Sequence, residues 1–340
     1  MGIDETEVTK IFEQSNAELI ELKNCNKNLF NLKIGLLNSF LNAITEKKRN
    51  KKYEKIIKDT TSKADIIYLF HDSILSQIPK GPIVIGSFHE RNPNPKAYSL
   101  FGSIFIILDM KLIKYKVLFK RIEYYHYQAL NLKPYVPKSS FYIPLSIDAT
   151  KYLPYNNIID HDDIIRLLSV DRLVKSKGID ILVDAFNIVK GKGRYELHVV
   201  GSGEMEYFIK NLKINGLVFH SLVNDETLIQ LYKYCDVFVF PSTSDRCGLI
   251  VLEALASIEY IIVNDSLKGV FDDFEHLNIL EHSKHDSLDV ANRIMSFKKK
   301  ISRYNKDVDL MIREKYDWPV IEKKLYDKFQ ELVNNNLTSG

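Results

Sequence analysis

Two carboxylates, Asp245 and Glu253, lie eight positions apart on either side of Gly248. The apolar run at 236–240 predicts a buried strand that ends at Pro241, and the residues from Gly248 onward predict a helix. Free backbone N–H groups at such a helix start bind anions, typically phosphate. Carboxylates would repel a phosphate but can accept hydrogen bonds from sugar hydroxyls. The pattern therefore predicts a site for a phosphorylated, hydroxyl-rich ligand.

Three further polar loops follow predicted strands. Arg172 and Lys177 lie between a strand and a helix, where they could neutralise phosphate oxygens. Gly201 and Gly203 would allow a backbone turn close to a ligand, and the segment 265–269 forms the last loop. Taken singly, these features also fit surface charges and tight turns. Because ligands bind beyond the carboxyl ends of strands in doubly wound sheets, their occurrence together indicates one site.

The elements that would position these loops follow a regular alternation from residue 164 onward. Single helical patterns separate short β-rich runs, and Asn224 is a predicted N-cap. Such alternation predicts a parallel sheet with helices on both faces, a doubly wound α/β domain. The predicted strands are 165–170, 196–200, 217–220, 236–240 and 260–263, and the predicted helices are 179–189, 204–212, 226–234 and 248–257.

The first half carries a less regular pattern. At 340 residues, two domains are expected. We predict an N-terminal domain at 1–150, a linker at 151–163, a second domain at 164–318 and a C-terminal helical segment at 319–340. The first-half predictions are strands at 17–22, 64–70, 83–87, 104–108 and 140–143 and helices at 6–15, 36–44 and 55–60, with a final helix at 320–333.

Composition is that of a soluble globular protein, with 45% hydrophobic and 27% charged residues. The apolar run at 99–108 is too short to span a bilayer, and the N-terminus lacks a secretory signal. Cys25, Cys235 and Cys247 are widely spaced without a metal-ligand pattern, which indicates a reducing compartment. Asp307-Val-Asp309 lies in a predicted helix and is not interpreted as a metal site. We expect a cytoplasmic protein without a bound metal.

Positive charge is concentrated in the first half, where residues 1–150 contain 22 Lys and Arg against 15 Asp and Glu. The remainder contains 25 against 29. Within 110–138, cations alternate with aromatic and aliphatic residues around a single acid, Glu123. This segment either rests on an anionic membrane surface or forms a solvated helix that covers its own sheet. No motif typical of nucleic-acid binding is present, so that class is excluded.

The chain resembles the retaining glycosyltransferases of family 4, most closely over 164–320. Asp245 and Glu253 match that family's Glu-x7-Glu signature, with Asp in the first position. Arg172 and Lys177 match its Gly-Arg-Leu-x-x-x-Lys-Gly segment, with Asp171 in place of the glycine. The resemblance extends to the segments 228–242, 143–148, 85–89 and the helix that begins at Trp318.

The resemblance implies the GT-B fold, with two Rossmann-like doubly wound domains facing a central cleft and a shortened first domain. Arg172 and Lys177 would neutralise the diphosphate of a nucleotide sugar, and His89 would face the sugar from the first domain. Asp245 would hold sugar hydroxyls and Glu253 the ribose. No metal or other cofactor is implied. The remaining implied donor-binding residues are Gly201, Gly203, Cys247, Gly248 and Leu249.

The leading functional hypothesis is an enzyme that moves a hexose-type sugar, with retention, from a UDP- or GDP-linked donor to a glycan or lipid-linked acceptor. Such an enzyme would work at the inner membrane face through 110–138 or free in the cytoplasm. Substitutions at 171 and 245 also fit a catalytically silent binding module. A third hypothesis is another GT-B activity, such as a sugar-nucleotide epimerase or a phosphorylase.

Overall fold

The computed structural model describes residues 64–69, 81–88, 122–153, 162–243, 245, 248–299 and 305–339. The chain divides into two compact units. The larger contains Tyr124–Leu325, and the smaller includes the described residues 64–69, 81–86 and 326–339. All the described residues of the predicted donor site belong to the larger unit.

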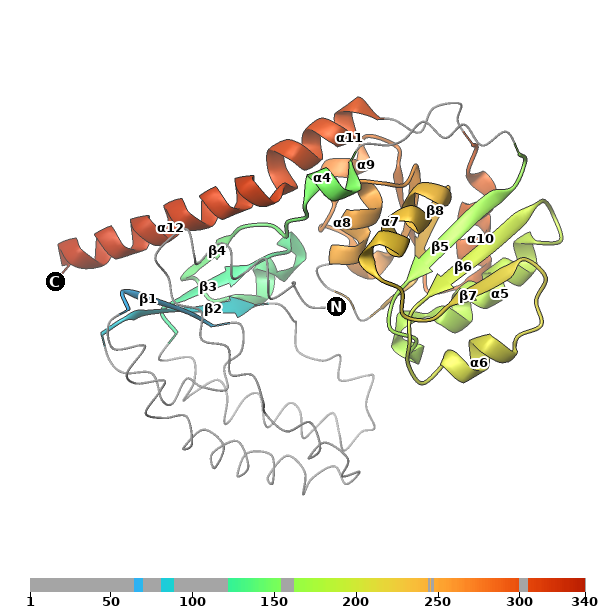
Figure 1. Ribbon diagram of the computed structural model, residues 1–340. Coiled ribbons are helices and arrows are strands. Elements are labelled where there is room, and N and C mark those ends of the chain that lie inside the picture. Colours follow the sequence, from blue (N-terminus) through green and yellow to red (C-terminus); the bar gives the residue numbers. More distant parts are fainter. Residues whose placement is uncertain are drawn as a thin grey trace, which may run out of the picture. The chain divides into compact units, whose positions relative to one another are not determined.

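A six-stranded parallel sheet forms the centre of the larger unit, in the order β10-β9-β8-β5-β6-β7 (Figure 1). The order reverses between β5 and β8, as it does in dinucleotide-binding Rossmann folds. The five strands predicted from 164 onward are confirmed, and β10 is an additional edge strand. Their bounds are β5 Ile165–Val170, β6 Tyr195–Val200, β7 Leu217–His220, β8 Val237–Phe240, β9 Tyr260–Asn264 and β10 Leu280–Ser283.

Helices connect these strands, and the four predicted ones are present within a few residues of their expected bounds. Asn224 caps α7 as predicted, its side chain accepting a hydrogen bond from the Thr227 N–H at 2.9 Å. The α-helices of the described residues are α4 Ala149–Tyr152, α5 Ile179–Val189, α6 Glu206–Asn211, α7 Asp225–Tyr234, α8 Leu249–Leu255, α9 Asp272–Glu275, α10 Ser287–Ser296, α11 Lys306–Met311 and α12 Trp318–Ser339.

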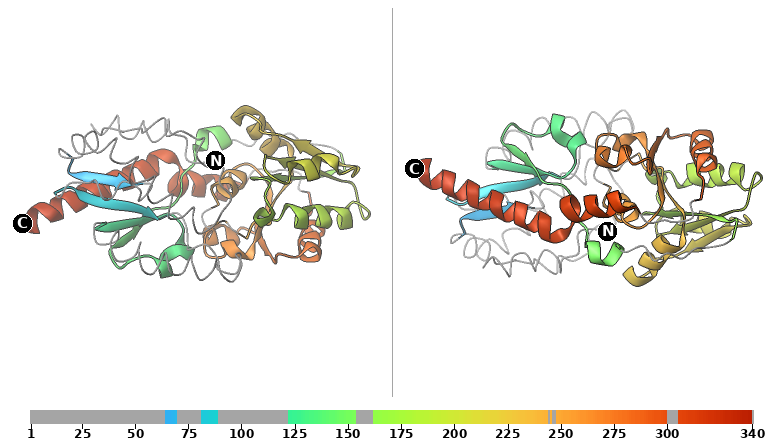
Figure 2. Two further views of the ribbon diagram at one scale, coloured as in Figure 1. Left: turned by 90° about the horizontal axis from the view of Figure 1, so that it is seen from below. Right: turned by 90° about the horizontal axis from the view of Figure 1, so that it is seen from above.

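Helices cover both faces of the six-stranded sheet (Figures 1 and 2). On one face, Phe186 of α5, Ile209 of α6 and Ile294 of α10 are buried against the strands. On the other, α7, α8 and α9 bury a second cluster that also includes residues from the 127–153 segment. Burial on both faces explains why these strands are nearly continuous in apolar residues.

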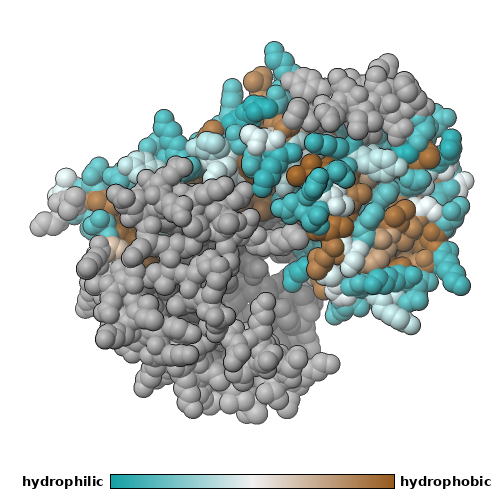
Figure 3. All heavy atoms as spheres, viewed as in Figure 1, coloured by the Kyte–Doolittle hydropathy of each residue, from teal (hydrophilic) through white to brown (hydrophobic). Residues whose placement is uncertain are grey.

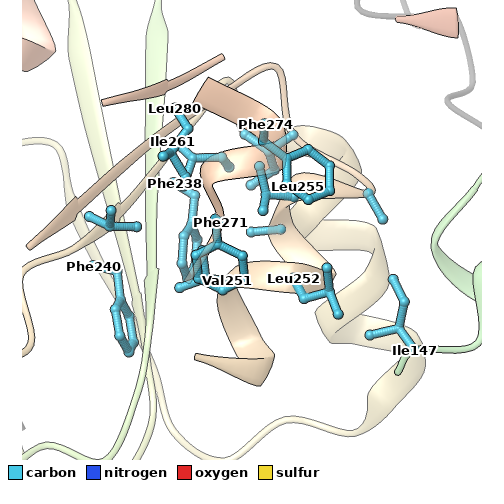
Figure 4. Close-up of a cluster of buried hydrophobic side chains, with 14 of the residues drawn as sticks. Ile147, Phe238, Phe240, Val251, Leu252, Leu255, Ile261, Phe271, Phe274 and Leu280 are labelled. Atoms are coloured by element: carbon cyan, nitrogen blue, oxygen red, sulfur yellow. The ribbon is translucent and has the colours of Figure 1, made fainter. Parts of the chain in front are cut away.

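Helix α8 is held in place by this second cluster. Figure 4 shows Val251, Leu252 and Leu255 of α8 beside Phe238 and Phe274. All five side chains are essentially inaccessible to solvent. Because such tightly packed side chains leave little room for rearrangement, the position of α8 relative to β8 is set by the core.

A second sheet has four strands in the order β1-β2-β3-β4. The predicted strands at 64–70, 83–87 and 140–143 are confirmed as β1 Ile66–Leu69, β2 Ile83–Phe88 and β4 Ser140–Tyr142, while β3 Tyr124–Tyr127 was not predicted. Tyr125 and Tyr127 are buried in this sheet, so this part of 110–138 forms a strand instead of a basic helical face. The predicted elements at 6–15, 17–22, 36–44, 55–60 and 104–108, and the cations of 111–121, lie outside the described residues.

The start of α12 is joined to the segment before α4. Ile147 and Asp317 form a parallel bridge, and the Trp318 N–H donates to the Ile147 carbonyl at 3.0 Å. A carboxylate oxygen of Asp317 also accepts from the Ala149 N–H at 2.9 Å. From Tyr326 the helix belongs to the smaller unit, where the Phe329 ring lies 5.8 Å from that of Tyr68.

Polar residues cover most of the coloured surface in Figure 3, with smaller apolar groups among them. The exposed apolar residues include Val218 of β7, which is 39% exposed, and Leu222, which follows that strand and is 67% exposed. Within the described part of the chain, every helix is too short or too polar to cross a membrane.

The loop after β5 is braced by the turn after β6. The Leu173 N–H donates to the Ser202 carbonyl at 2.8 Å, and the Met205 N–H donates to the Leu173 carbonyl at 2.8 Å. Gly201 has a φ of +147°, and a Cβ added there would lie 1.9 Å from the Asp171 carbonyl oxygen. Only glycine permits this approach, so Gly201 holds the 171–178 loop in position.

We predict that Gly201→Ala destabilises the protein by about 2 kcal/mol or more, because its methyl group collides with the Asp171 carbonyl. Urea denaturation would measure the loss. Gly191→Ala is the matched control, since a Cβ there meets nothing within 4 Å. Equal stability of the two variants would show that the turn does not need glycine at 201.

Candidate functional site

The site is centred on the ammonium group of Lys177, which lies among the carboxyl ends of the parallel strands. Its Nζ is paired with Oδ1 of Asp171 at 3.0 Å and with Oδ2 of Asp245. The Lys177 side chain is only 7% exposed, so a buried cation is shared by two carboxylates. Ser242 donates a hydrogen bond to the same Asp245 oxygen.

This ion pair joins the loops after β5 and β8. Gly178 follows Lys177 with a φ of +70°, and a Cβ there would lie 2.8 Å from the Pro241 carbonyl oxygen. The Thr243 N–H also donates to the Ser176 carbonyl at 3.3 Å. The cation loop and the carboxylate loop, 68 positions apart, therefore form one surface.

Asp171 has an unusual environment for a carboxylate. Its Oδ1 accepts from the Arg172 N–H at 2.7 Å, while its Oδ2 is buried and no described residue donates to it. Burial raises the pKa of Asp171 from 3.8 to about 6, against the lowering effect of the Lys177 charge, and Asp245 adds to the rise. A carboxyl group that titrates near neutral pH thus contacts the buried lysine.

Helix α8 starts at this surface. Gly248 caps it with a φ of +61°, and a Cβ there would come within 3.2 Å of the Phe271 ring. The first backbone hydrogen bond of the helix runs from the Val251 N–H to the Gly248 carbonyl at 2.9 Å. The N–H groups before it, including that of Leu249, belong to the turn that α-helices leave without internal acceptors.

Glu253 lies one turn further along α8, in a partly buried position. Tyr232 of α7 donates to its Oε2 at 3.1 Å, and Tyr152 of α4 also donates to this carboxylate. Burial raises the pKa of Glu253 from 4.5 to about 7, and the two tyrosine hydrogen bonds only partly oppose this rise. The Tyr232 pKa is raised well above 10 by its own burial and by the Glu253 charge.

The other residues predicted for the donor site do not all belong to this cluster around Lys177. Arg172 is exposed beside Asp171, and none of the described acids pairs with its guanidinium. Gly201 and Gly203 contact the backbone of 171–173, so the close approach they permit here is to the chain itself. His89 and Cys247 lie outside the described residues. The described residues contain no group of three His, Cys, Asp or Glu that could hold a metal ion.

The structure adds Asp171, Ser242, Tyr232 and Tyr152 to the site. Asp171 is visible in the sequence only as a departure from a glycine-containing motif. The two tyrosines come from α4 and α7, and nothing in their spacing relates them to Glu253. Only the packing of those helices against α8 brings the three residues together.

The fold of this chain is shared with solved structures. The structure of HepE from Anabaena, in complex with UDP and glucose, superposes with a TM-score of 0.61 at 14% identity, over 95% of this chain and 89% of that one. The architecture is that of GT-B glycosyltransferases, in which two Rossmann-like domains are joined in one chain.

Residues 157–308 match the model of the family Glycosyl transferases group 1. An uncharacterized glycosyltransferase of Methanocaldococcus jannaschii, MJ1607, is 33% identical over 120 residues, which are 34% of this chain and 30% of that protein. Alpha-monoglucosyldiacylglycerol synthase of Streptococcus pneumoniae is 30% identical over 128 residues, 35% of this chain and 29% of that protein. The aligned region thus spans less than a third of either relative.

We predict that Glu253→Gln raises the melting temperature at pH 8 but changes it little near pH 5. A carboxyl with a raised folded-state pKa contributes stability below its unfolded value of 4.5, and this contribution is lost as pH rises through about 7. The amide removes that loss, which we expect to be on the order of 1–3 kcal/mol.

Thermal denaturation between about pH 5 and pH 8 would measure this difference. Glu204→Gln, in the exposed turn before α6, is the control and should show the same pH profile as the unmodified chain. A constant offset between Glu253→Gln and the unmodified chain across this range would contradict the prediction.

Proposed function

We propose that this protein is a retaining glycosyltransferase that moves a hexose-type sugar from a UDP- or GDP-linked donor to a glycan or lipid-linked acceptor. The observation that carries the proposal is the meeting of a buried lysine, a carboxylate pair and a glycine-capped helix start at the carboxyl ends of β5 and β8. In a doubly wound sheet this is the position where nucleotides bind.

The chemistry of the site supports a diphosphate-containing donor. Lys177 supplies a localised charge and Arg172 an exposed guanidinium that can bind phosphate oxygens in a bidentate manner. As the bond between sugar and diphosphate breaks, negative charge grows on the leaving group, and these two cations would stabilise it. The backbone N–H groups at Gly248 and Leu249 would add donors to the same anion.

The two acids flanking the helix start would bind hydroxyl groups. Asp245 accepts a hydrogen bond from the Ser242 hydroxyl and would accept one from a sugar hydroxyl in the same way. Glu253 accepts from two tyrosine hydroxyls and would exchange one of them for a ribose hydroxyl. We further propose that the acceptor hydroxyl attacks on the face that the diphosphate leaves, with His89 opposite the sugar and no metal required.

Two relatives support the donor and acceptor classes. HepE, which shares the fold, was solved with UDP and glucose bound. The synthase from Streptococcus pneumoniae is named for a glucosylated diacylglycerol, which supports a lipid acceptor here. The second candidate, a catalytically silent module, is motivated by Asp171 and Asp245, which replace the glycine and glutamate of the family pattern.

We predict that one nucleoside diphosphate or its sugar raises the melting temperature, because a ligand that binds only the folded state stabilises it. UDP, GDP and ADP, each with its glucose or mannose conjugate, would be screened over increasing concentration. A bound donor that is neither hydrolysed nor transferred would support the silent module. No shift with any of them would contradict the proposed function.

With the donor identified, we predict that Lys177→Ala and Arg172→Ala each lower kcat/KM for the donor about a hundredfold, a loss near 3 kcal/mol of transition-state stabilisation. Lys175→Ala is the matched control, because Lys175 is an exposed cation in the same loop. If Lys175→Ala causes an equal loss, only the net charge of the loop matters and neither residue has a specific role.

A further inference from the structure

Asp171 stands where the motif that this segment resembles has glycine, and it contacts the cation assigned to the donor diphosphate. We propose that Asp171 is a positioning residue that holds Lys177 in place while the site is empty and takes up a proton from solvent when a nucleoside diphosphate binds. This inference rests on the proposed function, since it concerns the same donor site.

The geometry shows why Lys177 needs such a partner. Its ammonium is buried, and a buried ammonium without counter-charges is strongly destabilising. Asp171 at 3.0 Å and Asp245 on the same nitrogen supply those counter-charges when no ligand is present. Together they direct the lysine to the surface formed by the loops after β5 and β8.

A bound diphosphate would add negative charge beside Lys177 and its two carboxylate partners. One ammonium already faces two carboxylates, so a phosphate group arriving at Lys177 would meet a local excess of negative charge. Like charges at such short range in a buried site cannot all remain ionised, and one acid takes up a proton. Arg172, exposed beside the cluster, can offset only part of the added charge.

Asp171 is the acid that takes the proton. Its side chain is 16% exposed, against 25% for Asp245, and its Oδ2 is buried without a described donor. Asp245, by contrast, accepts a hydrogen bond from the Ser242 hydroxyl. Among the described residues, the charged or titratable groups facing Asp171 are Lys177 from its own loop and Asp245 from the loop after β8. The turn at 201–203, packed against it from β6, is Gly-Ser-Gly and has none.

The affinity for a nucleoside diphosphate should fall as the pH rises. The pKa of Asp171 is about 6 without ligand, and the added negative charge of the diphosphate raises it further. Between these two values binding consumes a proton, so the dissociation constant rises with pH, by up to about tenfold per unit. Well below pH 6 the residue is already neutral in the empty site, and affinity no longer depends on pH.

Isothermal titration calorimetry of the full chain tests this inference. UDP-glucose and GDP-mannose are suitable probes, because their phosphates are diesters without the second ionisation of a terminal phosphate. Titrations at about pH 7.5, in two buffers that differ in ionisation enthalpy, give the number of protons taken up. We expect uptake approaching one proton in the unmodified chain and near zero in Asp171→Asn.

Asp171→Asn should also bind the nucleotide sugar more tightly than the unmodified chain does at high pH. Asp171→Asn resembles the protonated acid, so we expect its affinity to be about tenfold or more above that of the unmodified chain at pH 8 and equal to it near pH 5.5. Asp171→Gly, the residue of that motif, should likewise lose the pH dependence. Asp184→Asn, an exposed acid on α5, is the control and should keep it.

The outcomes separate this inference from the proposed function. Binding of a nucleotide sugar with no proton uptake by the unmodified chain, or with equal uptake by Asp171→Asn, overturns the role of Asp171 and leaves the proposed function standing. Failure of every nucleotide sugar to bind the unmodified chain at any pH overturns the proposed function and this inference with it. The first measurement needs no variant, so a folding defect in Asp171→Asn cannot obscure the result.

Discussion

Burial of the Lys177 ammonium is the constraint on which the site depends. A buried cation requires counter-charges, and the chain supplies them from two loops that are far apart in sequence, through Asp171 and Asp245. Pairing them brings the carboxyl ends of β5 and β8 into one surface at the point where the strand order reverses. Gly178 and Gly201 allow the backbones to approach closely enough for this contact.

The two ends of the site share a physical property. Asp171 beside the lysine and Glu253 on α8 both have pKa values raised towards neutrality, because each carboxylate is largely removed from water. Acids with such perturbed pKa values gather at functional sites. Here they lie on either side of a helix start, and rigid core packing around Phe238 and Leu252 sets the spacing between them.

Much of the fold was predictable, because parallel strands buried on both faces leave a distinct apolar signal. The strands and helices of the larger unit from 165 to 263 appear close to their predicted bounds. Two strands were missed for identifiable reasons. Leu280–Ser283 is an edge strand with a single strongly apolar residue, and Tyr124–Tyr127 is an aromatic run within a lysine-rich region that suggested a helix. In the latter, burial of Tyr125 and Tyr127 outweighed the local charge pattern.

The sequence by itself determined the doubly wound architecture, the strand-end loops and the identity of the residues that could bind phosphate and hydroxyl groups. These follow from local periodicity and residue chemistry, which short windows of sequence contain. Only the tertiary structure decided which groups touch. The contact between Lys177 and the acids at 171 and 245, and that between Glu253 and tyrosines from two other helices, depend on long-range packing. Burial and charge, which determine the protonation of those acids, exist only once that packing has formed.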